Sequence, residues 1–294
     1  MIHIKLDPTN PGQFFACCGL LELADRIWPG TKGWFEKNTF CLLTTKDAAD
    51  ASAIGILGQL ADCVLTNTMT TQQVVRLGEL SAMKGHAREK TSDLDEEKKL
   101  LEKLRREGPI LLHAPFHLRL DWFQDDSAGG SRFKTWAGQQ SVLDIASSMK
   151  KAIEAPDWRT RAPDEWLSNT VRGCGLPFNF DSHLGGQGSA LDIGFSFDPL
   201  AASATTRIES TARPCLELLA FIGLQRFRPR QLMNDNRYVY CTWNQPLPPE
   251  LAAPAACGVF SLAGGPLFEF RLLYRTKYLK SFLPAIPYFG GSDE

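Results

Sequence analysis

Cationic, planar and amide side chains are concentrated between residues 132 and 140 of the sequence. Arg132 and Lys134 can neutralise phosphate charge. Trp136 offers a ring on which a base can stack, and Gln139 and Gln140 carry amides that can hydrogen-bond base edges. The segment predicts a nucleic-acid contact. The alternative is that its aromatic rings are buried and its cations are merely solvated, because short basic-aromatic runs are common.

Two further basic-aromatic tracts lie in the C-terminal third of the chain, which carries ten Arg and Lys against seven Asp and Glu from residue 205 onward. The second tract contributes Arg226, Arg228, Arg230 and Arg237, interspersed with aromatic residues. The third contributes Arg271, Arg275, Lys277 and Lys280. Three separated tracts are harder to attribute to coincidence than one, so we expect them to converge on a nucleic acid.

Residue types that could perform catalysis have no recognisable spacing. His113 and His117 are four residues apart, but Pro115 between them excludes the helix that would bring them together as metal ligands. Residues 181–183 form an Asp-Ser-His run, whose neighbours would point to opposite faces of a strand. Cys18 is in an apolar segment without a nearby histidine, which favours inert packing. We therefore expect no enzyme activity, no cofactor and no metal.

The bulk composition indicates a folded protein, with 44% hydrophobic and 22% charged residues among 294. The net charge of -1 argues against coating of nucleic acid by bulk charge, so any such surface must be local. Eight cysteines without a CxxC pair indicate free, buried thiols in a reducing compartment. No signal peptide opens the chain and no apolar run is long enough to span a bilayer, so we expect a cytoplasmic location.

The elements that must position these residues begin with a strand at residues 1–7 and a helix up to residue 27. Asn10 and Pro11 are a good N-cap and first-turn pair for this helix. Gly19 and the two cysteines before it mark a face that can press closely on a neighbouring element. A second strongly apolar helix is expected over 212–227, with Pro214 in its first turn.

Between these two helices we expect a strand at 39–45, helices at 48–62 and 71–80, and a charged helix at 88–107 that serves as a solvated face or partner contact. A strand is expected over 109–123, followed by a helix that begins near Thr135 and adds its positive N-terminal dipole to the first tract. The glycine-rich stretch 175–199 has the composition of a mobile surface loop.

The interleaving of helices and strands predicts an α+β fold with a mixed sheet, whose topology one sequence does not assign. We divide the chain into an N-terminal α/β region, residues 1–120, and a C-terminal α+β region, residues 121–294, which carries the basic-aromatic tracts.

Four patches of the sequence resemble a known family. They are DPTNPGQFFACCGLLELADRIWPG at the start, RLDWF followed by FKTWAGQQS, GLPFNFDSHLGG followed by DIGFSFDPL, and ARPCLELLAFIGLQRFRPR. Together they look like the large, Cas-eight-type subunit of the type I-G (formerly I-U) CRISPR Cascade complex. The chain is short for a large subunit, so the resemblance does not carry over the C-terminal helical bundle of many such proteins.

The resemblance implies a non-catalytic subunit of a crRNA-guided surveillance complex in antiviral defence. Its partners would be the backbone and crRNA-processing subunits, crRNA, target DNA and the helicase-nuclease. No membrane is expected among its partners. Its role would be to engage the duplex beside the PAM, support the R-loop and recruit the nuclease, while base pairing reads the sequence. The family supplies no catalytic residues, so the nucleic-acid contacts named above are assigned by physical argument alone.

Two other functions remain open from the residues. One is a crRNA-processing ribonuclease with His183 or His113 as general base, or a cysteine hydrolase with Cys18 as nucleophile. The other is a purely structural subunit that bridges proteins through apolar faces and the charged helix.

Overall fold

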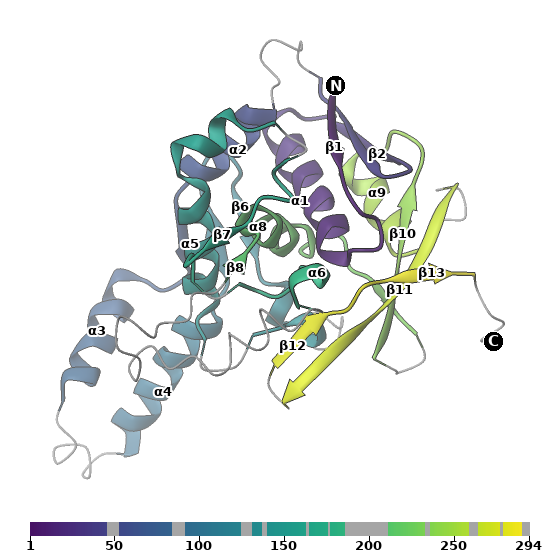
Figure 1. Ribbon diagram of the computed structural model, residues 1–294. Helices are drawn as coiled ribbons and strands as arrows, with labels where there is room; N and C mark the ends of the chain where they lie inside the picture. The colour runs from purple at the N-terminus through teal and green to yellow at the C-terminus, as the bar shows by residue number, and fades with distance from the viewer. Residues whose placement is uncertain are drawn as a thin grey trace.

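The computed structural model describes residues 1–45, 53–83, 92–124, 131–136, 140–162, 165–175, 177–185, 211–232, 236–258, 264–276 and 279–289. Helices and several small sheets alternate along the chain, which confirms the α+β class (Figure 1). Every strand pair within the described residues is antiparallel, and the strands form several small sheets.

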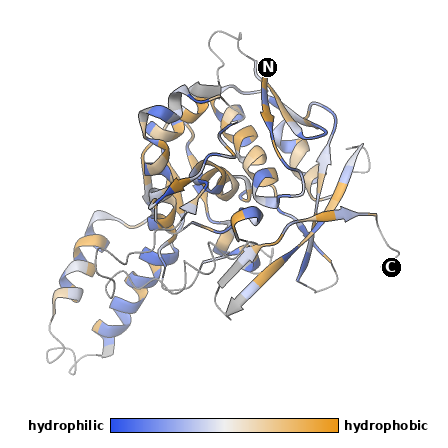
Figure 2. Ribbon diagram, in the orientation of Figure 1, coloured by the Kyte–Doolittle hydropathy of each residue, from blue (hydrophilic) through white to orange (hydrophobic). Residues whose placement is uncertain are grey.

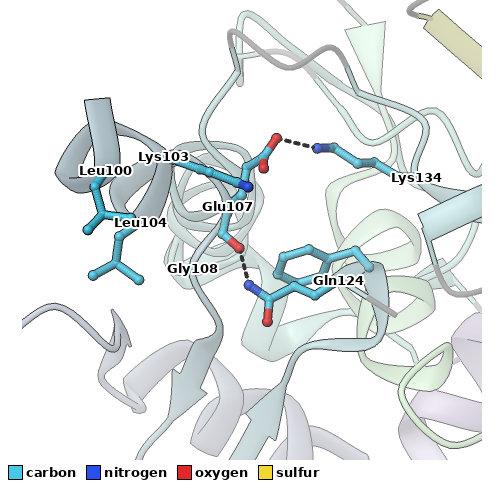
Figure 3. Close-up of a pocket in the computed structure, with 8 residues that line it drawn as sticks. Leu100, Lys103, Leu104, Glu107, Gly108, Gln124 and Lys134 are labelled. Atoms are coloured by element: carbon cyan, nitrogen blue, oxygen red, sulfur yellow. Dashed lines mark hydrogen bonds and ion pairs between the residues drawn. The ribbon is translucent and has the colours of Figure 1, made fainter. Parts of the chain in front are cut away.

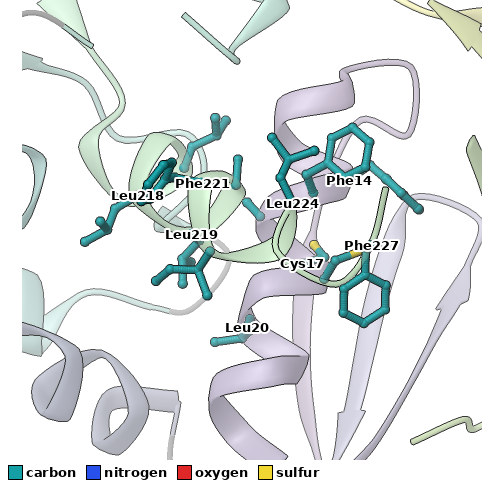
Figure 4. Packing of buried hydrophobic residues seen from close by; sticks show 14 of the residues in the cluster. Phe14, Cys17, Leu20, Leu218, Leu219, Phe221, Leu224 and Phe227 are labelled. Atoms are coloured by element: carbon teal, nitrogen blue, oxygen red, sulfur yellow. The ribbon is translucent and has the colours of Figure 1, made fainter. Parts of the chain in front are cut away.

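Two helices cross at the centre of the molecule. Helix α1, Pro11–Ile27, begins as predicted, with the Asn10 side chain accepting hydrogen bonds from the backbone N–H groups of residues 12 and 13 and with Pro11 in the first turn. Helix α8, Pro214–Gly223, is buried over its whole length. Figure 4 shows the side chains of α1 and α8 packed together, and Figure 2 shows how apolar α8 is.

Glycines allow the two helix backbones to touch. A Cβ atom added at Gly19 of α1 would lie 2.0 Å from the carbonyl oxygen of Leu219, and one added at Gly223 of α8 would lie 2.1 Å from that of Phe15. The close-packing face expected around Gly19 is therefore confirmed, and α8 is the element that it meets.

The described strands form four sheets around this helix pair. The first contains β1 (Ile2–Lys5), β3 (Thr39–Leu43) and β2 (Lys32–Glu36), and another contains β4 (Leu65–Asn67), β5 (Ile110–Leu112) and β6 (Leu118–Leu120). The pair β7 (Val171–Arg172) and β8 (Thr211–Ala212) is a third. The largest runs in the order β12 (Leu279–Phe282), β11 (Gly264–Thr276), β10 (Arg237–Trp243) and β9 (Arg230–Gln231), and β13 (Ile286–Tyr288) also pairs with β11.

The remaining helices surround the central pair. Helices α2 (Ala53–Asp62), α5 (Val142–Ile153) and α9 (Pro249–Ala256) pack on the body, and α6 (Ser182–Gly185) is a single short turn. The described residues include 3-10 turns at Trp122–Gln124, Ser131–Phe133 and Pro156–Thr160. Helices α3 (Thr71–Ala82) and α4 (Ser92–Glu107) form a hairpin that projects from the body, and α4 is its hydrophilic arm (Figures 1 and 2).

One continuous hydrophobic cluster extends from Ile2 to Ala285. It therefore includes residues of both predicted regions, 1–120 and 121–294, and α1 contacts α8 across the expected boundary at residue 120. A second, small cluster of Leu77, Leu80 and Leu101 holds the α3–α4 hairpin together.

The segment between 109 and 142 differs from its sequence prediction in two places. Pro115 lies between β5 and β6, which form a hairpin in place of one long strand, because proline cannot donate a ladder hydrogen bond. Helix α5 begins at Val142 with Ser141 as its N-cap, so the start expected near Thr135 is wrong. Helix α5 thus begins after the first basic-aromatic tract and not within it, so the dipole argument based on a helix start near Thr135 fails.

Candidate nucleic-acid interface

The first tract is divided between the core and a partly exposed edge. The Trp136 side chain is 2% exposed and its ring contacts Trp122, Phe123 and Phe178. The prediction of Trp136 as a stacking surface for bases is therefore corrected, since the ring is a core residue. Lys134 lies 2.9 Å from a Glu107 carboxylate oxygen and 5.7 Å from the centre of the Trp136 ring.

Arg132 joins the first tract to the second. The side chain is exposed, and its guanidinium donates a hydrogen bond to the side-chain oxygen of Gln231 in β9. The neighbouring Phe133 ring packs edge-on against Tyr238 of β10, with 4.6 Å between ring centres. Two tracts that are about a hundred residues apart in sequence thus meet at one end of the largest sheet.

The third tract reaches the same end of the sheet. Tyr274 of β11, 41% exposed, donates its phenol O–H to the amide oxygen of Asn236 at 3.3 Å. Burial raises the pKa of Tyr274, and the nearby Arg132 charge opposes that rise by stabilising the phenolate. Residues of all three tracts are therefore close together beside the β9–β10–β11 strands.

Strand register places three arginines on the outward face of this sheet. Directly opposed residues in antiparallel strands share a face, and successive residues alternate. Tyr238 and Tyr240 point into the core, so Arg237 and Val239 point to the other side of the sheet, where Arg237 is half-buried and Val239 is 0% exposed. Arg271 is opposite Arg237, and Arg230 is opposite Val239. We call this surface the arginine face, and define it by Arg230, Arg237, Arg271 and Glu269.

Glu269 is the carboxylate in the middle of the arginine face. It is 7% exposed and lies 3.6 Å from the guanidinium groups of both Arg237 and Arg271. One carboxylate cannot neutralise two guanidinium groups, so the described residues of this face carry a surplus of positive charge, to which Arg230 adds. Ile286 of β13, opposite Glu269 and 62% exposed, adds an apolar contact surface on the same face.

The other arginines of the second tract lie elsewhere. Arg226 is 2.6 Å from Glu22 of α1 and 3.8 Å from Glu250 of α9, where it ties the central helix pair to α9. Arg228 is half-buried, and its backbone oxygen accepts a hydrogen bond from the Cys257 thiol at 2.7 Å. The structure therefore brings Arg230 and Arg237 together and separates Arg226 from them.

Several predicted contacts lie wholly or partly outside the described residues. Gln139 and Lys277 lie outside the described residues, as do the side chains of Arg275 and Lys280, although their backbones are part of β11 and β12. Gln140 is half-buried just before the start of α5.

Sequence reasoning missed Glu269 as a member of the arginine face and Tyr274 as a residue beside it. The signal was present in the alternation FEFRLLY of residues 268–274, which puts the phenylalanines on one side and Glu269 with Arg271 on the other. What the sequence could not give is the pairing of β11 with β10, which sets Arg271 opposite Arg237.

The candidate catalytic residues are occupied in structural contacts. Cys18 is fully buried, and burial raises the pKa of its thiol well above the usual value, which opposes formation of a thiolate nucleophile. The His113 ring bonds the Thr66 hydroxyl at 2.8 Å, and the His183 ring bonds Asp7 at 3.0 Å. No group of three or more potential metal ligands occurs among the described residues.

Residues 179–182, placed in a surface loop by sequence, are buried in a polar cluster at the N-termini of α1 and α8. Asp181, 1% exposed, lies 3.0 Å from Arg213 and accepts a hydrogen bond from the Asn10 amide at 2.8 Å. Glu217 accepts hydrogen bonds from the backbone N–H groups of Phe180 and Asp181. The first part of the glycine-rich stretch is thus a fixed structural element, and residues 186–210 are outside the described part of the chain.

The cysteines are free thiols, as predicted, and most of them are buried. No helix within the described ranges has both the length and the apolar character needed to cross a bilayer. Comparisons with protein-family models, with curated proteins and with solved structures found no match to this chain.

Proposed function

We propose that this chain is a non-catalytic subunit of a crRNA-guided Cascade complex and contacts nucleic acid through the arginine face. The observation that carries the proposal is the meeting of three separate basic-aromatic tracts at one end of the β9–β10–β11 sheet. A surplus of guanidinium groups around one carboxylate suits phosphates, since arginine binds them bidentately.

The role within the complex follows from the resemblance of the four sequence patches. The subunit would contact target DNA beside the PAM, hold the backbone of the R-loop and help to recruit the helicase-nuclease in the cytoplasm. Because this face presents arginine side chains, we propose that the surface contacts mainly the phosphate backbone.

Binding of fluorescently labelled DNA and RNA by the purified chain tests the proposal, with anisotropy measured over a salt titration. Replacing Arg230, Arg237 and Arg271 together by alanine should lower affinity by roughly ten- to a hundredfold at low salt and reduce the slope of log K against log salt by about 2. The same variant should weaken target-DNA binding by the assembled complex.

Arg226→Ala is the matched control, because this arginine belongs to the same sequence tract but lies against Glu22. Its affinity and salt slope should equal those of the unmodified chain. Equal affinities for the triple variant and the control would remove the arginine face as the interface. Cleavage of repeat RNA that disappears in His183→Ala would favour the ribonuclease alternative.

A further inference from the structure

One face of helix α4 packs against α3. Near the middle of the helix, another face is not covered by any described residue. Leu101 packs with Leu77 and Leu80 of α3, and Arg76 of α3 holds both carboxylate oxygens of Glu97 at 2.9 Å. These contacts fix which side of α4 faces α3. The hairpin projects from the body (Figure 1), and Glu96, Leu100 and Lys103 of α4 are exposed.

The accessible face carries Glu96, Leu100, Lys103, Leu104 and Glu107. Their spacing of three and four residues aligns them along one stripe of the helix. Leu100 is 68% exposed, more than Val74, Val75 or Met83, which are the other large hydrophobic residues exposed in the described part of this hairpin. Leu100 thus lies between the oppositely charged side chains of Glu96 and Lys103 on this stripe.

Toward the body, this stripe borders a groove of about 530 Å³. Phe123, Gln124 and Lys134 form the opposite wall, and the aliphatic parts of Leu100 and Leu104 form the side on α4 (Figure 3). The groove thus combines an apolar lining with the ammonium groups of Lys103 and Lys134 and with the Glu107 carboxylate, which lies 2.9 Å from the Lys134 ammonium.

Charge is distributed unequally along α4. Residues 93–97 carry four carboxylates and no cation, whereas residues 98–107 carry five cations and two carboxylates. Leu100 is midway between residues 93 and 107. Among the described residues, Glu96 and Lys103 form no ion pair, although neighbours such as Lys98 and Glu102 do.

Such a stripe complements a second copy of itself. When two copies lie antiparallel about a two-fold axis at Leu100, the leucines meet, and the acidic half of each helix lies along the basic half of the other. Glu96 then approaches the partner's Lys103 twice in the same interface. A uniformly acidic or uniformly basic partner would match only one half of the stripe.

We propose that the α4 stripe is the interface of a homodimer, with the acidic half of each α4 seated at the groove of the other protomer. This inference is independent of the arginine face and of nucleic-acid binding. The two Glu96–Lys103 contacts supply orientation and specificity, and the paired Leu100 side chains supply the apolar centre.

Sedimentation velocity of the full chain over a micromolar concentration range at low salt tests the proposal. The unmodified chain should dimerise. Glu96→Lys and Lys103→Glu should each weaken dimerisation by roughly tenfold or more, because each places like charges opposite one another. Leu100→Glu should do the same. Leu251→Glu, which changes a 51% exposed leucine on α9, is the matched control and should dimerise normally.

Charge exchange makes the test specific. A mixture of the Glu96→Lys and Lys103→Glu chains should form a heterodimer, since both contacts then join opposite charges, and the double variant should recover its own homodimer. Circular dichroism shows whether each variant is folded. A folded unmodified chain that remains monomeric over the whole concentration range, or folded variants that fail to associate when mixed, would overturn the proposal.

Discussion

At the residue scale, the buried carboxyl of Glu217 gives the fold a defined pH dependence. Burial raises its pKa to about 8, nearby Asp181 adds to the rise, and hydrogen bonds from backbone N–H groups oppose it. A carboxyl with a raised pKa in the folded state contributes stability below its unfolded pKa. That contribution is lost as the pH rises from about 4.5 to about 8.

Glu217→Gln should remove this loss, because the amide keeps the shape and cannot ionise. From the lower to the upper end of that pH window, the unmodified chain should lose about 3 to 5 kcal/mol of unfolding free energy relative to the variant. Urea unfolding at several pH values measures it. Glu250→Gln, at an exposed carboxylate, controls for the loss of any negative charge. A constant difference would contradict the assignment of Glu217.

Residue types alone gave part of the candidate site. Arg230 and Arg237 were predicted and lie on one surface, while Trp136 was predicted to stack on bases and is buried. Tryptophan is equally suited to a core and to a binding surface. Trp136 is a core residue because the rings of Trp122 and Phe178, 14 and 42 residues away in the sequence, pack against it.

At the element scale, the crossing of α1 and α8 depends on the absence of side chains at Gly19 and Gly223. Gly19→Ala places a methyl group 2.0 Å from a backbone oxygen that cannot rotate away, so the helices must separate. We expect a loss of about 2 to 4 kcal/mol of unfolding free energy, as in overpacked cores.

Gly78→Ala in α3 is the matched control for this effect. Apart from the backbone of its own helix and its two chain neighbours, no described heavy atom lies within 4 Å of the added methyl group, so the higher helix propensity of alanine should stabilise the chain by up to about 1 kcal/mol. Thermal unfolding of the two variants should thus shift in opposite directions. If Gly19→Ala unfolded like the unmodified chain, the close crossing would be wrong.

Helix starts were predictable where a local capping signal was strong. Asn10 followed by Pro11 marked the start of α1. The start of α5 was misplaced because the polar segment before it contains Thr135 as well as Ser141, and only Ser141 accepts the capping hydrogen bond. Strand pairing was not predictable, since partners such as β5 and β4 are more than forty residues apart.

At the scale of the whole molecule, the single main core implies that residues 1–120 and 121–294 unfold together. The buried cysteines are natural probes of this cooperativity: Cys17 and Cys41 lie in the first region, and Cys215 and Cys241 lie in the second. All four belong to the same hydrophobic cluster. The tight α1–α8 crossing makes exposure of one region without the other costly.

Pulsed thiol labelling over a urea gradient, read out by mass spectrometry, should show all four cysteines becoming reactive at the same denaturant concentration. Gly19→Ala should shift the four midpoints downward by equal amounts, although the substitution lies in the first region. Earlier labelling of Cys17 and Cys41 than of Cys215 and Cys241 would show that the two regions unfold separately. In that case the α1–α8 contact would be a docking surface between two folding units.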